Sequence, residues 1–323
     1  MSLAAIFENF VEESPVTVMM RGTLERILSP EQLNALFDQT AQQQYTRELL
    51  FSDVVEVMIP VVAGMRPSVH ASYQASKAQM GVSLTSVYNK IDGIEPDVSA
   101  ALVRYSAREL ASVIEKLGGK KPDLVPGYRV KIFDGNALGG TEHRLEVLRN
   151  TSAGALPGKS LVVLDPALML AIELFPTEDG HAQERSLLKE VLKTVEANDL
   201  WIADRNMCVL AFLLAIAQRQ AAFVIREHAS LPQQPLSPLR RVGESETGEV
   251  WEQIVLLEQE GQQLQVRRVV VRLHQPTRDG ETEIAILTNL PETVASCFKV
   301  AELYRKRWTV ETFFQVLTTS KKL

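Results

Sequence analysis

The sequence predicts an α/β protein: a mixed sheet flanked by helices, with an all-helical N-terminal domain before it and a β-rich insertion within it. Apolar residues follow a helical period to about residue 120, the period then becomes strand-like, and strands afterwards alternate with helices. At 323 residues, 46% of them hydrophobic, the chain can form two or three folding units. We expect a helical domain at 1–122 and a sheet domain at 123–323, interrupted by the insertion at 229–285.

The N-terminal domain carries clear signals for helix starts and stops. Ser29 is suited to cap a helix that begins at Pro30, and Gln32 would complete a capping box. A last helix is expected at 96–117, because the Gly- and Lys-rich segment 118–122 then breaks the pattern.

Within this domain, residues 71–80 and 83–91 read as two helices joined at Gly81. The second helix is polar and would suit a DNA groove. Any pair of antiparallel helices in a helical domain gives the same pattern, so the sequence leaves both interpretations open.

The sheet domain is predicted from short apolar runs that end at turn residues. Strands are expected at 128–133, 160–164, 170–175, 200–203 and 222–225, the first ending at Asp134-Gly135. Helices are expected at 182–197 and 207–218, and the insertion should hold a Pro- and Gln-rich loop at 231–238 and strands at 251–257, 265–273 and 283–288.

Charge and cysteine content narrow the class of protein. A formal net charge of −6 argues against a protein that coats nucleic acid nonspecifically. Residues 299–323 nevertheless hold six Lys or Arg and two Glu, which indicates either a phosphate-facing patch or an ordinary solvated helix face.

The two cysteines form no disulfide framework, which fits a cytoplasmic location. The longest apolar run, 207–217, is roughly half the ~20 residues needed to cross a bilayer, so no membrane partner is implied.

Three carboxylates stand at positions that could converge. Asp134 and Asp204 each directly follow a hydrophobic strand, and neighbouring strands would bring them together. Glu311 lies on a helix expected at 299–316, on the same face as Tyr304 and Arg307. An oxygen-only cluster favours a hard cation such as Mg²⁺. Two such ions about 4 Å apart could activate a water or a 3′-hydroxyl for phosphodiester displacement.

Each of these residues also has an ordinary structural explanation. An aspartate at a strand end is commonly a helix N-cap or a turn residue. Glu311 and Arg307 could form an i, i+4 ion pair worth ~0.3 to 0.5 kcal/mol. A metal site is favoured because three carboxylates occur together in this pattern, one after each of two strands and one on a helix late in the chain.

At these residues the chain resembles the DDE transposases of bacterial insertion sequences, specifically the insertion-sequence-four group. The hallmark of that group is Tyr-x2-Arg-x3-Glu-x6-Lys on a helix. The segment YRKRWTVE supplies Tyr304, Arg307 and Glu311 at this spacing, IFDGN supplies Asp134 and WIADRN supplies Asp204. The resemblance runs from about Asp134 to Glu311, and the β-rich insertion falls where such transposases carry one.

The resemblance implies an RNase H-like sheet and cut-and-paste transposition at the element's terminal inverted repeats. It implies two Mg²⁺ ions, for which Mn²⁺ could substitute, held by Asp134, Asp204 and Glu311. It implies DNA contacts from Tyr304, Arg307 and Lys322. The partners would be double-stranded DNA, as terminal repeats and as target, and a second copy of the chain in a homodimer. Residues 1–122 would bind the DNA ends, and the protein would be associated with the nucleoid.

One position departs from the motif. Its lysine should fall at Thr318, and Lys322 lies on the same helix face one turn further on. This leaves a second hypothesis, a truncated and catalytically inactive transposase that binds transposon ends and inhibits transposition. A third hypothesis is an RNase H-like nuclease without element specificity, against which the long insertion speaks.

Overall fold

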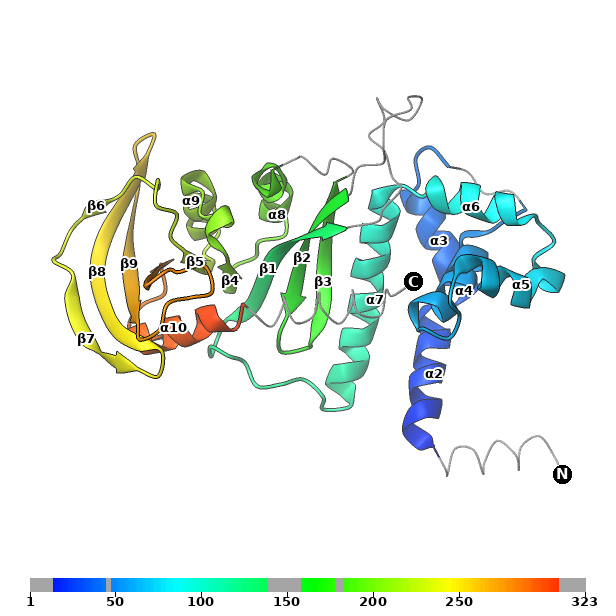
Figure 1. Cartoon of the computed structure of the whole chain (residues 1–323), viewed down its shortest axis with the longest axis horizontal. Helices are drawn as coiled ribbons and strands as arrows, with labels where there is room; N and C mark the ends of the chain where they lie inside the picture. The colour runs from blue at the N-terminus through cyan, green and yellow to red at the C-terminus, as the bar shows by residue number, and fades with distance from the viewer. Residues whose placement is uncertain (1–13, 45–47, 139–157, 178–182, 308–323) are drawn as a thin grey trace. The chain divides into compact units, whose positions relative to one another are not determined.

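The computed structural model describes residues 14–44, 48–138, 158–177 and 183–307 (Figure 1). The chain divides into two compact units, with the boundary between Val113 and Ile114. That boundary falls inside a helix, upstream of the break at 118–122. Each unit is described by itself.

The described part of the first unit consists of helices. They are α2 (Pro15–Ile27), α3 (Pro30–Thr40), α4 (Phe51–Val62), α5 (Val69–Met80), α6 (Leu84–Asp92) and α7 (Pro96–Lys116). Ser29 caps α3 as predicted, since its Oγ accepts a hydrogen bond of 3.5 Å from the Gln32 N–H. Buried Leu33 and Phe37 of α3 pack with Phe51 of α4, so local capping and packing fix the same helix.

The second unit is built on one ten-stranded sheet (Figure 1). Its strands are β1 (Arg129–Leu138), β2 (Gly158–Asp165), β3 (Leu170–Thr177), β4 (Asp199–Ala203), β5 (Ala222–Arg226), β6 (Gln234–Pro235), β7 (Arg240–Ser245), β8 (Gly248–Gln259), β9 (Gln262–Leu273) and β10 (Glu283–Thr288). They follow the order β3-β2-β1-β4-β5-β10-β9-β8-β6, and β7 pairs with β8.

The sheet is mixed, as the sequence predicted. β1 pairs in parallel with β4, and β4 in parallel with β5, whereas β2, β3 and β10 run antiparallel to their neighbours. The order β3-β2-β1-β4-β5 with these directions is consistent with an RNase H-like domain. The strands from the predicted insertion add to the same sheet, because β10 pairs with β5 and β9 with β10.

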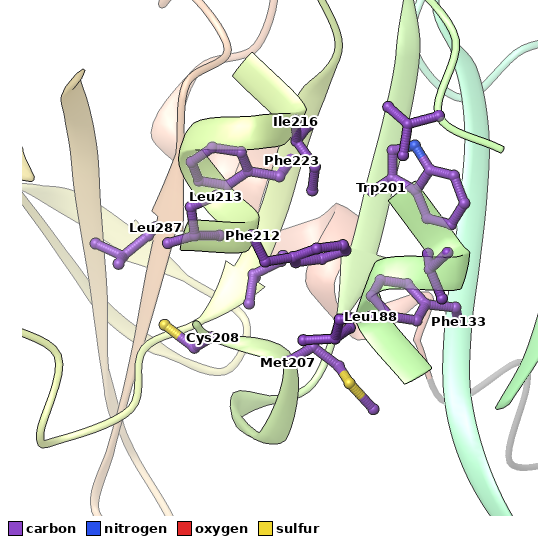
Figure 2. Close-up of a cluster of buried hydrophobic side chains, with 14 of the residues drawn as sticks. Phe133, Leu188, Trp201, Met207, Cys208, Phe212, Leu213, Ile216, Phe223 and Leu287 are labelled. Atoms are coloured by element: carbon purple, nitrogen blue, oxygen red, sulfur yellow. The ribbon is translucent and has the colours of Figure 1, made fainter. Parts of the chain in front are cut away.

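Helices cover both faces of this sheet, because successive strand residues point to opposite sides. Phe133 and Trp201 belong to a buried cluster with residues of α8 (Leu188–Leu192) and α9 (Leu210–Gln218), shown in Figure 2. The preceding residues in each strand, Ile132 and Leu200, belong to a second cluster on the face of α10 (Cys297–Arg305). A strand residue two positions beyond Ile132 therefore faces α10.

The first strand of the sheet is longer than predicted. The sequence interpretation ended it at Asp134-Gly135, but β1 continues to Leu138. Its parallel pairing with β4 stops at the pair Ile132–Ile202, while its antiparallel pairing with β2 runs on. The turn-like Asp-Gly-Asn sequence stays extended because β2 supplies its hydrogen-bond partners.

The helix predicted at 182–197 is also wrong in length. The structure has a 3-10 turn, η2 (Glu184–Leu187), followed by the short α8. A buried ion pair explains the early end: Lys131 Nζ lies 2.7 Å from Asp199 Oδ2 and donates to the Thr194 carbonyl at 3.1 Å. Asp199 Oδ2 also accepts from the Glu196 N–H at 2.8 Å. The Glu196 N–H, which a longer helix would donate to the Leu192 carbonyl, is taken by Asp199 instead.

The apolar helix predicted at 207–218 starts later. A 3-10 turn, η3 (Arg205–Met207), precedes α9, which has nine residues. In the described ranges of the chain, no helix is both long enough and apolar enough to span a membrane.

Both cysteines are buried free thiols, and we expect them to react slowly in the native protein. Burial raises the pKa of Cys208 to about 11 and also raises the pKa of Cys297. At pH 8, Cys208 would be roughly 0.1% thiolate, against about a quarter for a free cysteine. A colorimetric thiol assay should show slow modification of native protein and rapid reaction of two thiols in guanidinium. Fast stoichiometric reaction of the native protein would contradict this.

Candidate active site

The parallel pair β1–β4 places two aspartates at equivalent positions. Ile132 pairs with Ile202, and Asp134 and Asp204 each lie two residues further along. Asp204 keeps an extended backbone, with φ −78° and ψ 172°, so the alternation of faces continues past the end of β4. Adjacent strands are about 4.8 Å apart. Both carboxylates therefore lie at one edge of the sheet, on the face that α10 covers.

The helix α10 and the turn that follows it bring two further predicted residues to the same place. Ser296 caps it through the Lys299 N–H, and Val300 and Leu303 bury its inner face against the sheet. Tyr304 Oη donates a hydrogen bond of 3.1 Å to Asp204 Oδ1. One turn on, Arg307 forms an ion pair of 2.6 Å with Asp134 Oδ2. Four of the six predicted site residues are thus in direct contact as two pairs, 100 and 173 residues apart in sequence.

Burial and the neighbouring charges keep the Tyr304 hydroxyl group protonated. Burial raises the pKa of Tyr304 to about 12, and the negative charge of Asp204 acts in the same direction against the opposing Arg307 and Arg226. A group with a raised pKa keeps its proton up to that pH, so Tyr304 is a neutral hydrogen-bond donor throughout the physiological range. It can hold Asp204 or a phosphate oxygen, but it is not a base.

A family model described as a transposase DDE domain matches residues 127–320, more than half of the chain. The chain belongs to this transposase family. The match includes Asp134, Asp204, Tyr304, Arg307 and Glu311. It makes the protein an enzyme of the transposase type that acts on DNA, and such domains generally use divalent metal ions. Among curated proteins, no match was found.

The candidate site includes two arginines and a glutamate that the sequence did not predict. Arg226 ends β5, and its guanidinium lies 2.5 Å from Glu281 Oε2. Burial alone would lower the pKa of Arg226, but the hydrogen bond to Glu281 and the negative charges of Glu281 and Asp204 raise it. Arg205, directly after Asp204, binds the other Glu281 oxygen at 2.8 Å. Arg226 could have been found, because it occupies the end of the third parallel strand.

Glu281 belongs to the segment between β9 and β10, so the predicted insertion contributes the carboxylate that pairs with Arg205 and Arg226 near Asp204. The hydrogen bond from Arg226 holds the pKa of Glu281 below its usual value, and the charges of Arg226 and Arg205 help. The carboxylate therefore stays ionised and fixes both arginines. Nothing in the local sequence around Glu281 indicated this contact.

Gly135 shows how closely the chain packs beside Asp134. The side-chain carboxylate of Glu184 occupies the space where a Cβ at position 135 would lie. Glu184 also accepts from Asn206 Nδ2 at 3.4 Å, which links η2 to η3. Any larger residue at this position would displace the Glu184 carboxylate.

The donor set can be compared with the needs of a divalent cation. Asp134 and Asp204 supply carboxylate oxygens, the ligands that Mg²⁺ and Mn²⁺ prefer. Within the described ranges, no group of three or more His, Cys, Asp or Glu side chains is placed to hold a metal. The third predicted ligand, Glu311, and the predicted DNA contact Lys322 lie outside the described residues. The chemistry of the two aspartate side chains therefore suits the role predicted for them, as oxygen ligands of a divalent cation.

Proposed function

We propose that this protein is a DDE transposase of the insertion-sequence-four group. It would cut DNA at the terminal inverted repeats of an insertion sequence and join the freed ends to target DNA, acting at the nucleoid. The contacts of Tyr304 in α10 and of Arg307 in the turn after it with the two strand-end aspartates carry this proposal, because the two residues have the Tyr-x2-Arg spacing of that group.

Asp134, Asp204 and Glu311 would hold two Mg²⁺ ions, or Mn²⁺ in their place. When bound, such ions supply activation of a water or 3′-hydroxyl and stabilisation of the leaving oxygen. Arg307 can neutralise Asp134 in the free enzyme and bind a phosphate in the DNA complex, since a guanidinium suits both anions. Tyr304 would orient Asp204 and donate to the DNA backbone, and Lys322 would add a phosphate contact.

The rest of the chain would bind and align the DNA. Residues 1–122 are proposed as the domain that binds the DNA ends, and 123–323 as the catalytic domain with its insertion at 229–285. The proposed assembly is a homodimer on two ends. Arg205 and Arg226 support a DNA-facing catalytic domain, because two arginines share one carboxylate, Glu281, near Asp204 in a chain whose net charge is −6.

Metal-dependent cleavage tests the proposal. Labelled duplexes from the two DNA segments that flank the coding sequence would be incubated with the full chain and Mg²⁺, Mn²⁺ or EDTA. We expect cleavage at one position of each flank with either metal and none with EDTA. An unrelated duplex of equal length is the control. Equal cleavage of that duplex would instead indicate a nuclease without element specificity.

Thr318, at the position of the motif lysine, is the observation that favours the second candidate. An end-binding protein without catalysis would shift the flanking duplexes in a gel but leave them uncut in both metals. It would also inhibit an intact transposase in the same mixture. Cleavage by the present chain would rule this candidate out.

A further inference from the structure

The helices α5 and α6 are joined by a very short turn. Only Gly81, Val82 and Ser83 separate them, and Gly81 has φ +64°, a left-handed conformation that glycine adopts at little cost. Ser83 then caps α6, because its Oγ accepts from the Ser86 N–H at 3.1 Å. This arrangement is a helix-turn-helix with a fixed entry into its second helix.

The core of the unit fixes the orientation of α6. Tyr73 of α5 is buried and donates from its hydroxyl to the Val82 carbonyl at 2.7 Å, which locks the turn. Val87 of α6 is fully buried in a cluster with Val54 and Val57 of α4. One face of α6 is therefore held against α4 and α5, and the opposite face is presented to solvent.

That solvent face is polar and aromatic. Thr85, Tyr88 and Asn89 are exposed and lie within one arc, since they are spaced i, i+3 and i+4. Tyr88 leaves 38% of its surface exposed, a large value for an aromatic residue. These three side chains offer hydrogen-bond donors and acceptors without a charge, and the exposed Asp92 follows on the same arc at the C-terminal end of α6.

The charge distribution around this motif is unusual for the chain. Residues 57–91, which include α5 and all of α6 except its last residue, contain no Asp or Glu, although 40 of the 323 residues are acidic. The next acidic residue is the exposed Asp92, which ends α6. The same segment contains three basic residues, Arg66, Lys77 and Lys90. Arg66 and Lys77 are exposed. A segment with two exposed basic side chains and no acidic residue before the end of α6 suits a surface that faces phosphates, which an ordinary helical hairpin does not require.

We propose that α5 and α6 are a DNA-reading helix-turn-helix, with Thr85, Tyr88 and Asn89 of α6 facing base edges in the major groove. In such motifs the second helix enters the groove and the first crosses the backbone, which would set Lys77 of α5, and Arg66 just before it, near phosphates. An asparagine can bind adenine in a bidentate manner, and a threonine hydroxyl can bind several bases. This inference rests on the proposed function and names the residues through which the N-terminal domain would choose its DNA.

Fluorescence anisotropy on the full chain tests this proposal. The probes are the flanking duplex and a shuffled duplex of the same composition, both in EDTA. We expect Asn89→Ala and Tyr88→Ala each to weaken binding of the flanking duplex by about 5- to 100-fold while binding of the shuffled duplex changes little. Gln39→Ala, at an exposed position of α3, is the matched control and should change neither. Unchanged thermal unfolding would show that each variant is folded.

The two basic residues give a second, independent readout. Lys77→Gln and Arg66→Gln should weaken both duplexes alike and reduce the slope of log affinity against log salt by about one each. The proposal is overturned if wild type binds both duplexes equally, or if Asn89→Ala and Tyr88→Ala bind the flanking duplex as wild type does. Metal-dependent cleavage would then still support the proposed function. Conversely, specific binding that needs Asn89 but is never followed by cleavage would support this proposal and contradict the proposed function.

Discussion

Asp204→Asn is expected to lower metal-dependent DNA cleavage roughly a thousandfold, about 4 kcal/mol of transition-state stabilisation, and to leave DNA binding unchanged. The asparagine keeps an oxygen that can accept from Tyr304 Oη, where Asp204 now accepts at 3.1 Å. It also keeps the size of the side chain. What it loses is the negative charge that a divalent cation requires. The rate of cleavage of the flanking duplex in Mg²⁺ measures the effect.

Two further variants make this result specific. Asp123→Asn removes an equal charge from an exposed position in the same unit, and should cleave as wild type does. Asp204→Cys should be inactive with Mg²⁺ and partly active with Mn²⁺, because a thiolate is a poor ligand for Mg²⁺ and a better one for Mn²⁺. Cleavage by Asp204→Asn within about threefold of wild type would show that Asp204 holds no essential metal.

Asp199→Asn is expected to destabilise the second unit by about 3 to 5 kcal/mol. The side chains of Lys131 and Asp199 are 6% and 1% exposed, and they pair at 2.7 Å. Removing the carboxylate leaves a buried ammonium without its counter-charge, and weakens the acceptor for the Glu196 N–H. Residues 1–113 contain no tryptophan and Trp201 and Trp251 lie in the second unit, so the change of tryptophan fluorescence in urea follows the unfolding of that unit.

Other ion pairs of the same unit provide the controls. Lys193→Met breaks the pair with Glu190, whose partners are 69% and 53% exposed, and should cost less than about 1 kcal/mol. The double variant Lys131→Met/Asp199→Leu should recover much of the loss, because replacing both partners leaves no buried charge. A cost below about 1 kcal/mol for Asp199→Asn would contradict this account.

The parts of the fold that depend on local signals were predictable from the sequence. The cap at Ser29 and the turn at Gly81 follow from nearest neighbours, and the structure confirms both. The mixed sheet also follows, since each strand has its own apolar run. The two aspartates could be proposed because strand ends are visible in sequence, whereas their shared register with Ile132–Ile202 became visible only in the paired strands.

The errors arise where distant residues override a local pattern. The helix expected at 182–197 ends early where Asp199, held by Lys131 some seventy residues upstream, takes the Glu196 N–H. β1 runs past Asp134 because β2 pairs with it. Glu281 could not be assigned to the site either, since its partners Arg205 and Arg226 are 76 and 55 positions away. Such choices depend on tertiary contacts that no window of sequence contains.

The continuity of the sheet through β10 has a consequence for protein engineering. Val250 of β8 and Val269 of β9 share one buried cluster with Val300 and Leu303 of α10. Excising the segment between β5 and α10 would remove apolar side chains that pack with α10, the helix that carries Tyr304. A chimera with altered target choice should therefore keep those strands intact and graft new loops onto their exposed tips, because the segment is not an interchangeable cassette.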